Sequence, residues 1–394
     1  MLNFYNRPDA NGNGGGDGNG VSHSVADGFD QIRAAIDNTV SKWLDLPDGT
    51  KCDEPRTDVK TTAAMLGDSD VRTSVEGSGE IATSNETIHE VVVNNFKGSF
   101  KSPFLDKYYT QLSEVTQGLG SGCVILEANY AAQREMWPAA REDVAAICAS
   151  AHSAWSQRAG EAAAANTRVL LSVVGAVAGA VASVVTAGTG TVATVAALST
   201  VAAAANSAVE AISADTDVTG GSYGEILNSL DAALETLNTT IREQEEALET
   251  MLTDTSSAMD DDLESFDLSA FTLGEYSTDE GNIDMDRSDT EIVSNNMAHI
   301  EDVLAAASTT LGSPPLNPTY RNADIGLGSS GTHTAARGLY SLVSQSLENT
   351  TSAYKLGHEL FDATVEDFFE TEAEIKKTIT DLLAEEALSS ESGT

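Results

Sequence analysis

The sequence has few aromatic residues and few basic residues, and each scarcity excludes a class of protein. Phe, Trp and Tyr make up only 6% of the 394 residues, while Ala, Ser and Thr are abundant. This composition favours slender, closely packed helices over a thick α/β core. Only 21 Lys and Arg residues oppose 61 Asp and Glu residues, which gives a formal net charge of -40. Because no basic patch could neutralise phosphates, we expect no nucleic-acid partner.

Catalytic and metal-binding motifs are also missing. Cys52, Cys123 and Cys148 form no CxxC pair, and the six histidines accompany neither a GxSxG nor an HExxH motif. We therefore expect a non-enzymatic protein without a cofactor or a metal. The disulfide state stays open at this point: a bridge would have to involve Cys52 if the helix between the other two cysteines is continuous, and three thiols are an equally good prediction.

The first 20 residues are rich in Gly and Asn and lack the basic and apolar regions of a signal peptide. We expect a disordered tail here. Export, if it occurs, would then need a route other than the general one. A strongly acidic surface stays in solution through self-repulsion. It suits either a secreted or cell-surface protein or one from the cytoplasm of a salt-adapted cell, and the sequence does not separate the two.

No convincing strand pattern occurs, whereas apolar residues recur at helical spacing along most of the chain. We predict an all-α, elongated bundle of long antiparallel helices, with Pro138 kinking or restarting one of them. Ser288 is expected to cap a helix that ends near residue 311, and 215–221 to be a loop. The predicted units are 1–20, a tail; 21–135, N-terminal helices; 136–259, long helices; 260–287, an acidic linker; and 288–394, C-terminal helices.

An uncharged, apolar stretch over 169–209 is the most unusual feature of the chain. Two runs of helical length, 169–185 and 192–209, meet at a glycine-rich turn and predict a helical hairpin. Small residues four apart let two helix backbones approach closely. The residues expected to form the hairpin are Val169, Val174, Gly175, Val177, Gly179, Val181, Val192, Val195 and Leu198.

This hairpin has three interpretations. It is the buried tip of a soluble bundle, a segment that enters a membrane after a conformational change, or a permanent transmembrane hairpin. The first run is near the lower limit for spanning a bilayer, which needs about 20 apolar residues. The acidic flanks would be repelled by an anionic membrane surface. We therefore favour the buried tip, with a membrane as the alternative partner of 169–209.

The last predicted helix, 334–388, has the most regular periodicity. Its seam residues, most of them apolar, alternate at spacings of four and three, as in a heptad seam that packs on other helices. The seam consists of Tyr354, His358, Phe361, Val365, Phe368, Glu372, Ile375, Ile379 and Leu382.

Phe96-Lys97-Gly98 lies between two predicted helices. Gly98 permits a tight turn, and the ring of Phe96 can wedge the two helices apart at the bend. The segment 57–135 thereby resembles the WXG (ESAT-like) family of type VII secretion substrates, which are antiparallel helical hairpins with Trp-x-Gly at the turn. The resemblance implies export without a signal peptide.

The same resemblance implies an export signal, Tyr-x-x-x-Asp/Glu, after the second helix. Tyr130 stands at the matching place, with Arg134 four residues on and Glu135 as the nearest acid. A second candidate is Phe368 with Glu372, in a C-terminal region similar to a small ESX-associated substrate. There, phenylalanine stands in place of tyrosine.

Three functional hypotheses follow. The first is a secreted, non-enzymatic helical protein, resembling type VII secretion substrates, that associates through its helices with a protein partner or with copies of itself. The second is an α-helical pore-forming or membrane-remodelling protein that inserts 169–209. The third is a structural protein of a salt-adapted organism or its virus.

Overall fold

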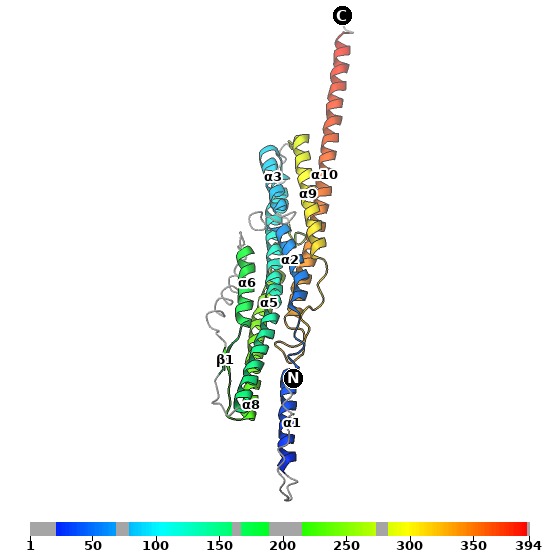
Figure 1. Cartoon of the computed structure of the whole chain (residues 1–394). Helices are drawn as coiled ribbons and strands as arrows, with labels where there is room; N and C mark the ends of the chain where they lie inside the picture. The colour runs from blue at the N-terminus through cyan, green and yellow to red at the C-terminus, as the bar shows by residue number, and fades with distance from the viewer. Residues whose placement is uncertain (1–20, 68–78, 160–166, 189–214, 273–282, 392–394) are drawn as a thin grey trace, which may run out of the picture.

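The computed structural model describes residues 21–67, 79–159, 167–188, 215–272 and 283–391. Long helices run side by side along one axis, so the expected all-α, elongated bundle is confirmed (Figure 1). The α-helices are α1 Val21–Ser41, α2 Asp53–Leu66, α3 Glu80–Asn95, α4 Lys101–Leu105, α5 Leu112–Ala159, α6 Val173–Gly188, α8 Tyr223–Asp261, α9 Arg287–Leu311 and α10 His333–Glu391. Two short 3₁₀ helices, η1 Gly49–Cys52 and η3 Leu263–Ser265, and one π-helical segment, η2 Asp106–Gln111, lie between them.

Helix α5 forms the centre of the bundle and packs against α2, α6, α8 and α10. It is continuous through Pro138, so of the two alternatives predicted there, a kink or a restart, the restart was wrong. Trp137, immediately before the proline, and Ala140, two residues after it, are fully buried. A proline inside a helix removes one backbone hydrogen bond and crowds the carbonyl of the preceding turn. Tertiary packing of this kind, more than local propensity, stabilises helices in proteins.

Two short strands contradict the expectation that the chain has none. β1 Thr167–Leu170 pairs antiparallel with β2 Asp215–Val218, so that Val169 lies opposite Thr216. In β1 the side chain of Val169 is buried and that of Leu170 is exposed, the alternation typical of a strand with one buried face. The predicted first helical run therefore begins four residues late, at Val173, and the predicted loop 215–221 begins as a strand.

Helix α9 starts one residue earlier than expected and has a different cap. Asp286, not Ser288, is the N-cap: its Oδ1 accepts hydrogen bonds from the Ser288 backbone N–H at 3.0 Å and from Ser288 Oγ at 2.9 Å. These hydrogen bonds lower the pKa of Asp286. A side-chain oxygen that satisfies an unpaired N–H is the usual role of aspartate at a helix start.

The loop between α9 and α10 is attached to the bundle by a fully buried ion pair. Arg321 donates from Nη2 to Glu245 Oε2 of α8, and neither side chain is exposed to solvent. The Leu327 backbone N–H donates to the same carboxylate oxygen at 2.9 Å, and the Arg321 guanidinium lies 4.5 Å from the centroid of the Trp137 ring. Burial raises the pKa of Glu245, with Arg321 opposing the shift. Moving the loop away would leave Glu245 buried without its cation, which is costly. The network therefore fixes the position of the loop and of the start of α10.

Part of the predicted acidic linker is packed onto α10. Leu268 is fully buried, and its backbone N–H donates to Thr350 Oγ1 at 3.1 Å. Asn349 donates from Nδ2 to Asp267 Oδ2 at 2.7 Å. No disulfide joins Cys52, Cys123 and Cys148, all of which lie in the described residues. The predicted tail 1–20 lies outside those residues.

Candidate functional site

The turn between α3 and α4 contains both residues that the WXG-like motif singles out. Phe96 follows the last residue of α3 and is 2% exposed, and its ring centroid lies 6.0 Å from that of Phe100. Gly98 has a backbone φ of +124°, a conformation that favours glycine. A Cβ at Gly98 would come within 3.1 Å of Ile283 Cγ1. The chain thus turns sharply here, with the ring of Phe96 inside the bundle.

Lys97, between these two residues, joins the turn to the segment before α9. Its backbone N–H donates to Asp284 O at 3.0 Å, the Asp284 N–H donates back to Lys97 O, and Lys97 Nζ lies 2.6 Å from Asp284 Oδ2. Both side chains are more than half exposed, so this ion pair contributes at most about 1 kcal/mol. The backbone bridge orients the turn.

Tyr130, the first export-signal candidate, is inside the core. It belongs to α5 and is 2% exposed. Its hydroxyl has no hydrogen-bond partner among the described residues, and burial raises the pKa of the phenol. The neighbouring Arg134 and Glu135 pair with each other near the surface. The folded protein therefore does not present the Tyr130 ring to a receptor.

Helix α10, which carries the second candidate, is packed in its first half. Tyr354 is fully buried, and the ring of Phe361 lies 5.5 Å from that of Phe104, measured between centroids. His358 Nδ1 is 3.1 Å from Glu301 Oε2 of α9. These residues are seam positions, so the predicted heptad face does pack on other helices in this half.

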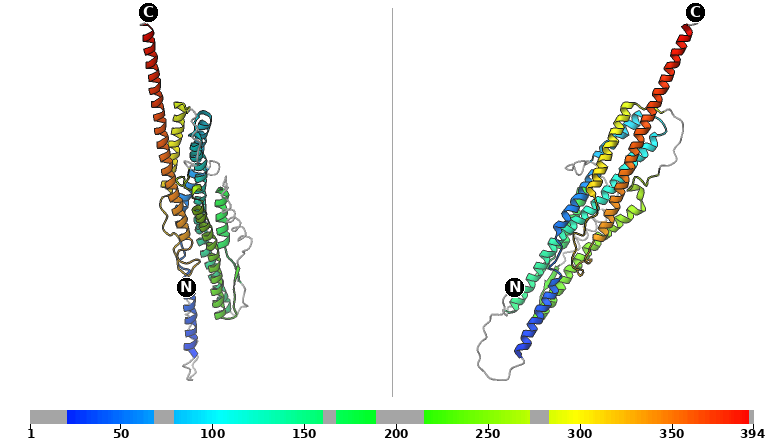
Figure 2. Two further views of the ribbon diagram at one scale, coloured as in Figure 1. Left: turned by 180° about the vertical axis from the view of Figure 1, so that it is seen from behind. Right: turned by 90° about the vertical axis from the view of Figure 1, so that its right-hand side faces the viewer.

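Within the described part of the chain, the contacts of α10 with the bundle reach as far as the start of α9. There the Arg287 guanidinium lies 4.7 Å from the centroid of the Phe369 ring. Every side chain from 370 to 378 is exposed, and Ile375 is 56% exposed. Figures 1 and 2 show that α10 continues past the ends of α3 and α9. We call residues 370–391 the α10 overhang.

The heptad seam continues from the packed half of α10 into the overhang. Phe368 is half-buried at the edge of the bundle, Glu372 follows four residues later, and Ile375 three residues after that. Residues at such spacings lie on one face of a helix. The second export-signal candidate consists of Phe368 and Glu372. These two residues therefore lie together on an accessible surface.

Helix α6, the first arm of the predicted apolar hairpin, has two different faces. Its valines are buried where it packs against α5, whereas Gly175, Gly179 and Ser183 are exposed. The buried valines are Val173, Val174, Val177, Val181 and Val184. Among the candidate hairpin residues, Val169 lies in β1, while Val192, Val195 and Leu198 lie outside the described residues.

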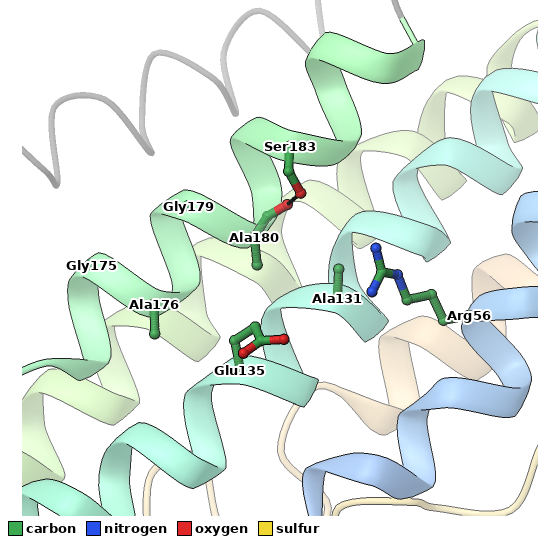
Figure 3. Close-up of a pocket in the computed structure, with 8 residues that line it drawn as sticks. All are labelled: Arg56, Ala131, Glu135, Gly175, Ala176, Gly179, Ala180 and Ser183. Atoms are coloured by element: carbon green, nitrogen blue, oxygen red, sulfur yellow. Dashed lines mark hydrogen bonds between the residues drawn. The ribbon is translucent and has the colours of Figure 1, made fainter. Parts of the chain in front are cut away.

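A cavity of about 460 Å³ lies between α6, α5 and α2 (Figure 3). Small residues of α6 form one wall, and Ala131 and Glu135 of α5 with Arg56 of α2 form the other. Figure 3 shows the side chains of Arg56 and Glu135 on the wall opposite α6. No described helix combines the length and hydrophobicity that crossing a bilayer requires.

The start of α6 is capped by a residue of α5 that the sequence analysis missed. Asp143 Oδ1 and Oδ2 each lie 2.9 Å from the Ser172 backbone N, and Oδ2 also accepts from the Val173 N–H at 3.2 Å. Ser172 Oγ donates to Asp143 Oδ1 at 2.9 Å. Burial raises the pKa of Asp143, and these hydrogen bonds oppose that shift. No signal in the sequence predicts this pair, because its residues are 29 positions apart.

The described residues contain no group of three His, Cys, Asp or Glu side chains suited to a metal ion. The α10 overhang, which continues the seam onto an exposed surface, is the candidate functional site. Comparison with protein families, with curated proteins and with solved structures gives no match for this chain.

Proposed function

We propose that this chain is a non-enzymatic helical protein that acts by helix–helix association through its α10 overhang. The observation that carries this proposal is the continuation of one heptad seam from a packed environment into an exposed one. In the packed half, Tyr354 is fully buried, whereas Ile375 on the same seam is 56% exposed. A partner helix on the overhang would continue the packing that the bundle begins.

The dimensions of the overhang fit this role. Its 22 residues extend roughly 33 Å at about 1.5 Å per residue. That length corresponds to about three heptads. An isolated helix of this size is marginal in water, and most helical stability in proteins comes from packing of an apolar face. The overhang therefore gains stability when another helix covers its seam.

Site-specific photo-crosslinking in the producing cells tests the association. A photoreactive amino acid is placed at Ile375, and the matched control carries it at Ala373, which is also exposed but lies about 160° away around the helix. We expect discrete adducts, with a partner or a second copy, from position 375 and few from 373. Equal yields at the two positions, or none at either, would overturn the proposal.

We further propose that the protein is exported by a type VII route, with Phe368 and Glu372 as the export element. The resemblance of 57–135 and of the C-terminal region to type VII substrates supports this, together with the accessibility of Glu372. Replacing Phe368 with Ala should strongly reduce the extracellular fraction, and Tyr130→Phe should leave it unchanged because Tyr130 is buried. Normal export of the Phe368→Ala variant would contradict the assignment.

A further inference from the structure

The seam of the α10 overhang contains a carboxylate. Glu372 lies between Phe368 and Ile375, at heptad spacings of four and three residues, and is exposed. Among the described residues it takes part in no ion pair. We propose that the overhang binds an amphipathic helix of a partner protein that places a Lys or Arg side chain opposite Glu372. This inference rests on the association function proposed above.

The requirement for a cation follows from desolvation. A helix that covers Phe368 and Ile375 also removes Glu372 from water. Burying a carboxylate without a partner is costly, whereas a well-placed cation offsets that cost. A single polar residue in an otherwise apolar seam also specifies the register of the two helices, because only one alignment pairs it. Glu372 therefore selects both the chemistry and the alignment of the partner.

The charge of the overhang favours the same class of partner. Residues 370–391 contain seven acidic and two basic residues, a net charge of -5. This field attracts a basic helix and repels an acidic one. A second copy of this chain carries the same charge, and a parallel pair in register would place Glu372 against Glu372. Like charges at close range disfavour that arrangement.

The chain itself provides an example of a cation that covers this end of α10. Arg287, from the start of α9, stacks on the Phe369 ring at 4.7 Å. Cations are attracted to aromatic faces, and arginine is well suited to such contacts. Within the described residues, an arginine thus contacts α10 one helical turn before Glu372. The proposed partner would place a second cation against α10 one turn further along the helix, at Glu372.

Two synthetic helical peptides of three heptads test the proposal. Both have a Leu seam and neutral flanks, and they differ only at one central seam position, which is Arg in one and Glu in the other. Binding to the full-length protein is measured by fluorescence anisotropy. We expect the Arg peptide to bind about tenfold or more tightly than the Glu peptide, as measured couplings of close charge pairs imply.

Charge-swap variants assign the effect to one side chain. Glu372→Arg should reverse the preference, so that the Glu peptide binds more tightly. Glu374→Arg makes the same charge change two residues away, on a different face of the helix, and should retain the preference for the Arg peptide. Circular dichroism of both variants checks that α10 remains helical.

Three outcomes would overturn the inference while leaving an association function in place. The two peptides could bind equally, neither peptide could bind although position 375 crosslinks in cells, or the protein could be a dimer that Ile375→Asp converts to a monomer. A different outcome would overturn both proposals. If Ile375→Asp binds the Arg peptide as tightly as the unaltered protein does, the seam is not the docking surface.

Discussion

The two parts of α10 have the same periodicity but opposite environments. In the first part, Leu347 and Tyr354 are fully buried, whereas Ile375 in the overhang is 56% exposed. Leu347 and Ile375 are 28 residues apart, which is four heptads, so they occupy the same seam. The difference shows that a heptad pattern identifies the helix face that can pack against another helix. Whether a helix of the same chain covers that face depends on how the other helices are placed.

The position of α10 relative to α9 explains the difference. α9 begins at Arg287, beside Phe369, and no described helix continues alongside the overhang (Figure 2). The buried Arg321–Glu245 pair fixes the loop from which α10 starts. If that attachment holds the first part of α10 in place, loss of the pair should destabilise the bundle more than changes in the overhang do.

Arg321→Ala is expected to have the largest effect. It leaves Glu245 buried without its cation, which should lower the free energy of unfolding by about 3–5 kcal/mol. Lys97→Ala is the control, because it removes an exposed ion pair and should cost at most about 1 kcal/mol. Urea denaturation followed by circular dichroism measures both. Equal losses in the two variants would contradict a special role for the buried pair.

The local pattern predicts much of this fold. Helical spacing places α8, α9 and α10 to within a few residues, and glycine at position 98 predicts the turn after α3. What the pattern does not reveal are pairings between distant parts of the chain. Arg321 and Glu245 are 76 residues apart, and β1 and β2 are short strands separated by α6.

The candidate site was predicted only in part. The sequence identifies the seam of α10, because periodicity is a local property, and Phe368 and Glu372 follow from it. Periodicity does not reveal where the intramolecular partner of the seam ends. Tyr130 illustrates the same limit: its place in a motif suggests a surface signal, but helices distant in sequence bury it.

Paired alanine substitutions on one seam should sharpen the contrast within α10. Leu347→Ala removes a fully buried side chain and should lower the free energy of unfolding by about 2–5 kcal/mol. Ile375→Ala changes an exposed side chain and should shift it by no more than about 0.5 kcal/mol. Thermal or urea unfolding of the two variants provides the comparison. A large loss for Ile375→Ala would mean that the overhang is already packed in solution.

The cap of α6 should give the smallest of these effects. Asp143→Ala removes the acceptor of the Ser172 and Val173 N–H groups, which should lower the free energy of unfolding by about 1 kcal/mol. Asp143→Asn keeps one oxygen acceptor and should cost less. The two variants together separate the hydrogen bonds of the cap from its charge.

Because Asp143 can be ionised and asparagine cannot, the free energy of unfolding of the unaltered protein depends on pH in a way that the Asp143→Asn variant lacks. Burial raises the pKa of Asp143 in the folded protein above its ordinary 3.8, so the folded state binds the proton more tightly than the unfolded state does. The contribution of this group to stability is therefore largest below the ordinary pKa and is lost as pH rises through the raised pKa.

The free energy of unfolding of the unaltered protein, minus that of Asp143→Asn, should fall across this acid window and stay constant above it. Urea denaturation at a series of pH values measures the difference, and subtracting the variant cancels groups such as Glu245 that titrate in both. A difference that rises with pH would mean that the hydrogen bonds from Ser172 and Val173 outweigh the desolvation of the carboxylate.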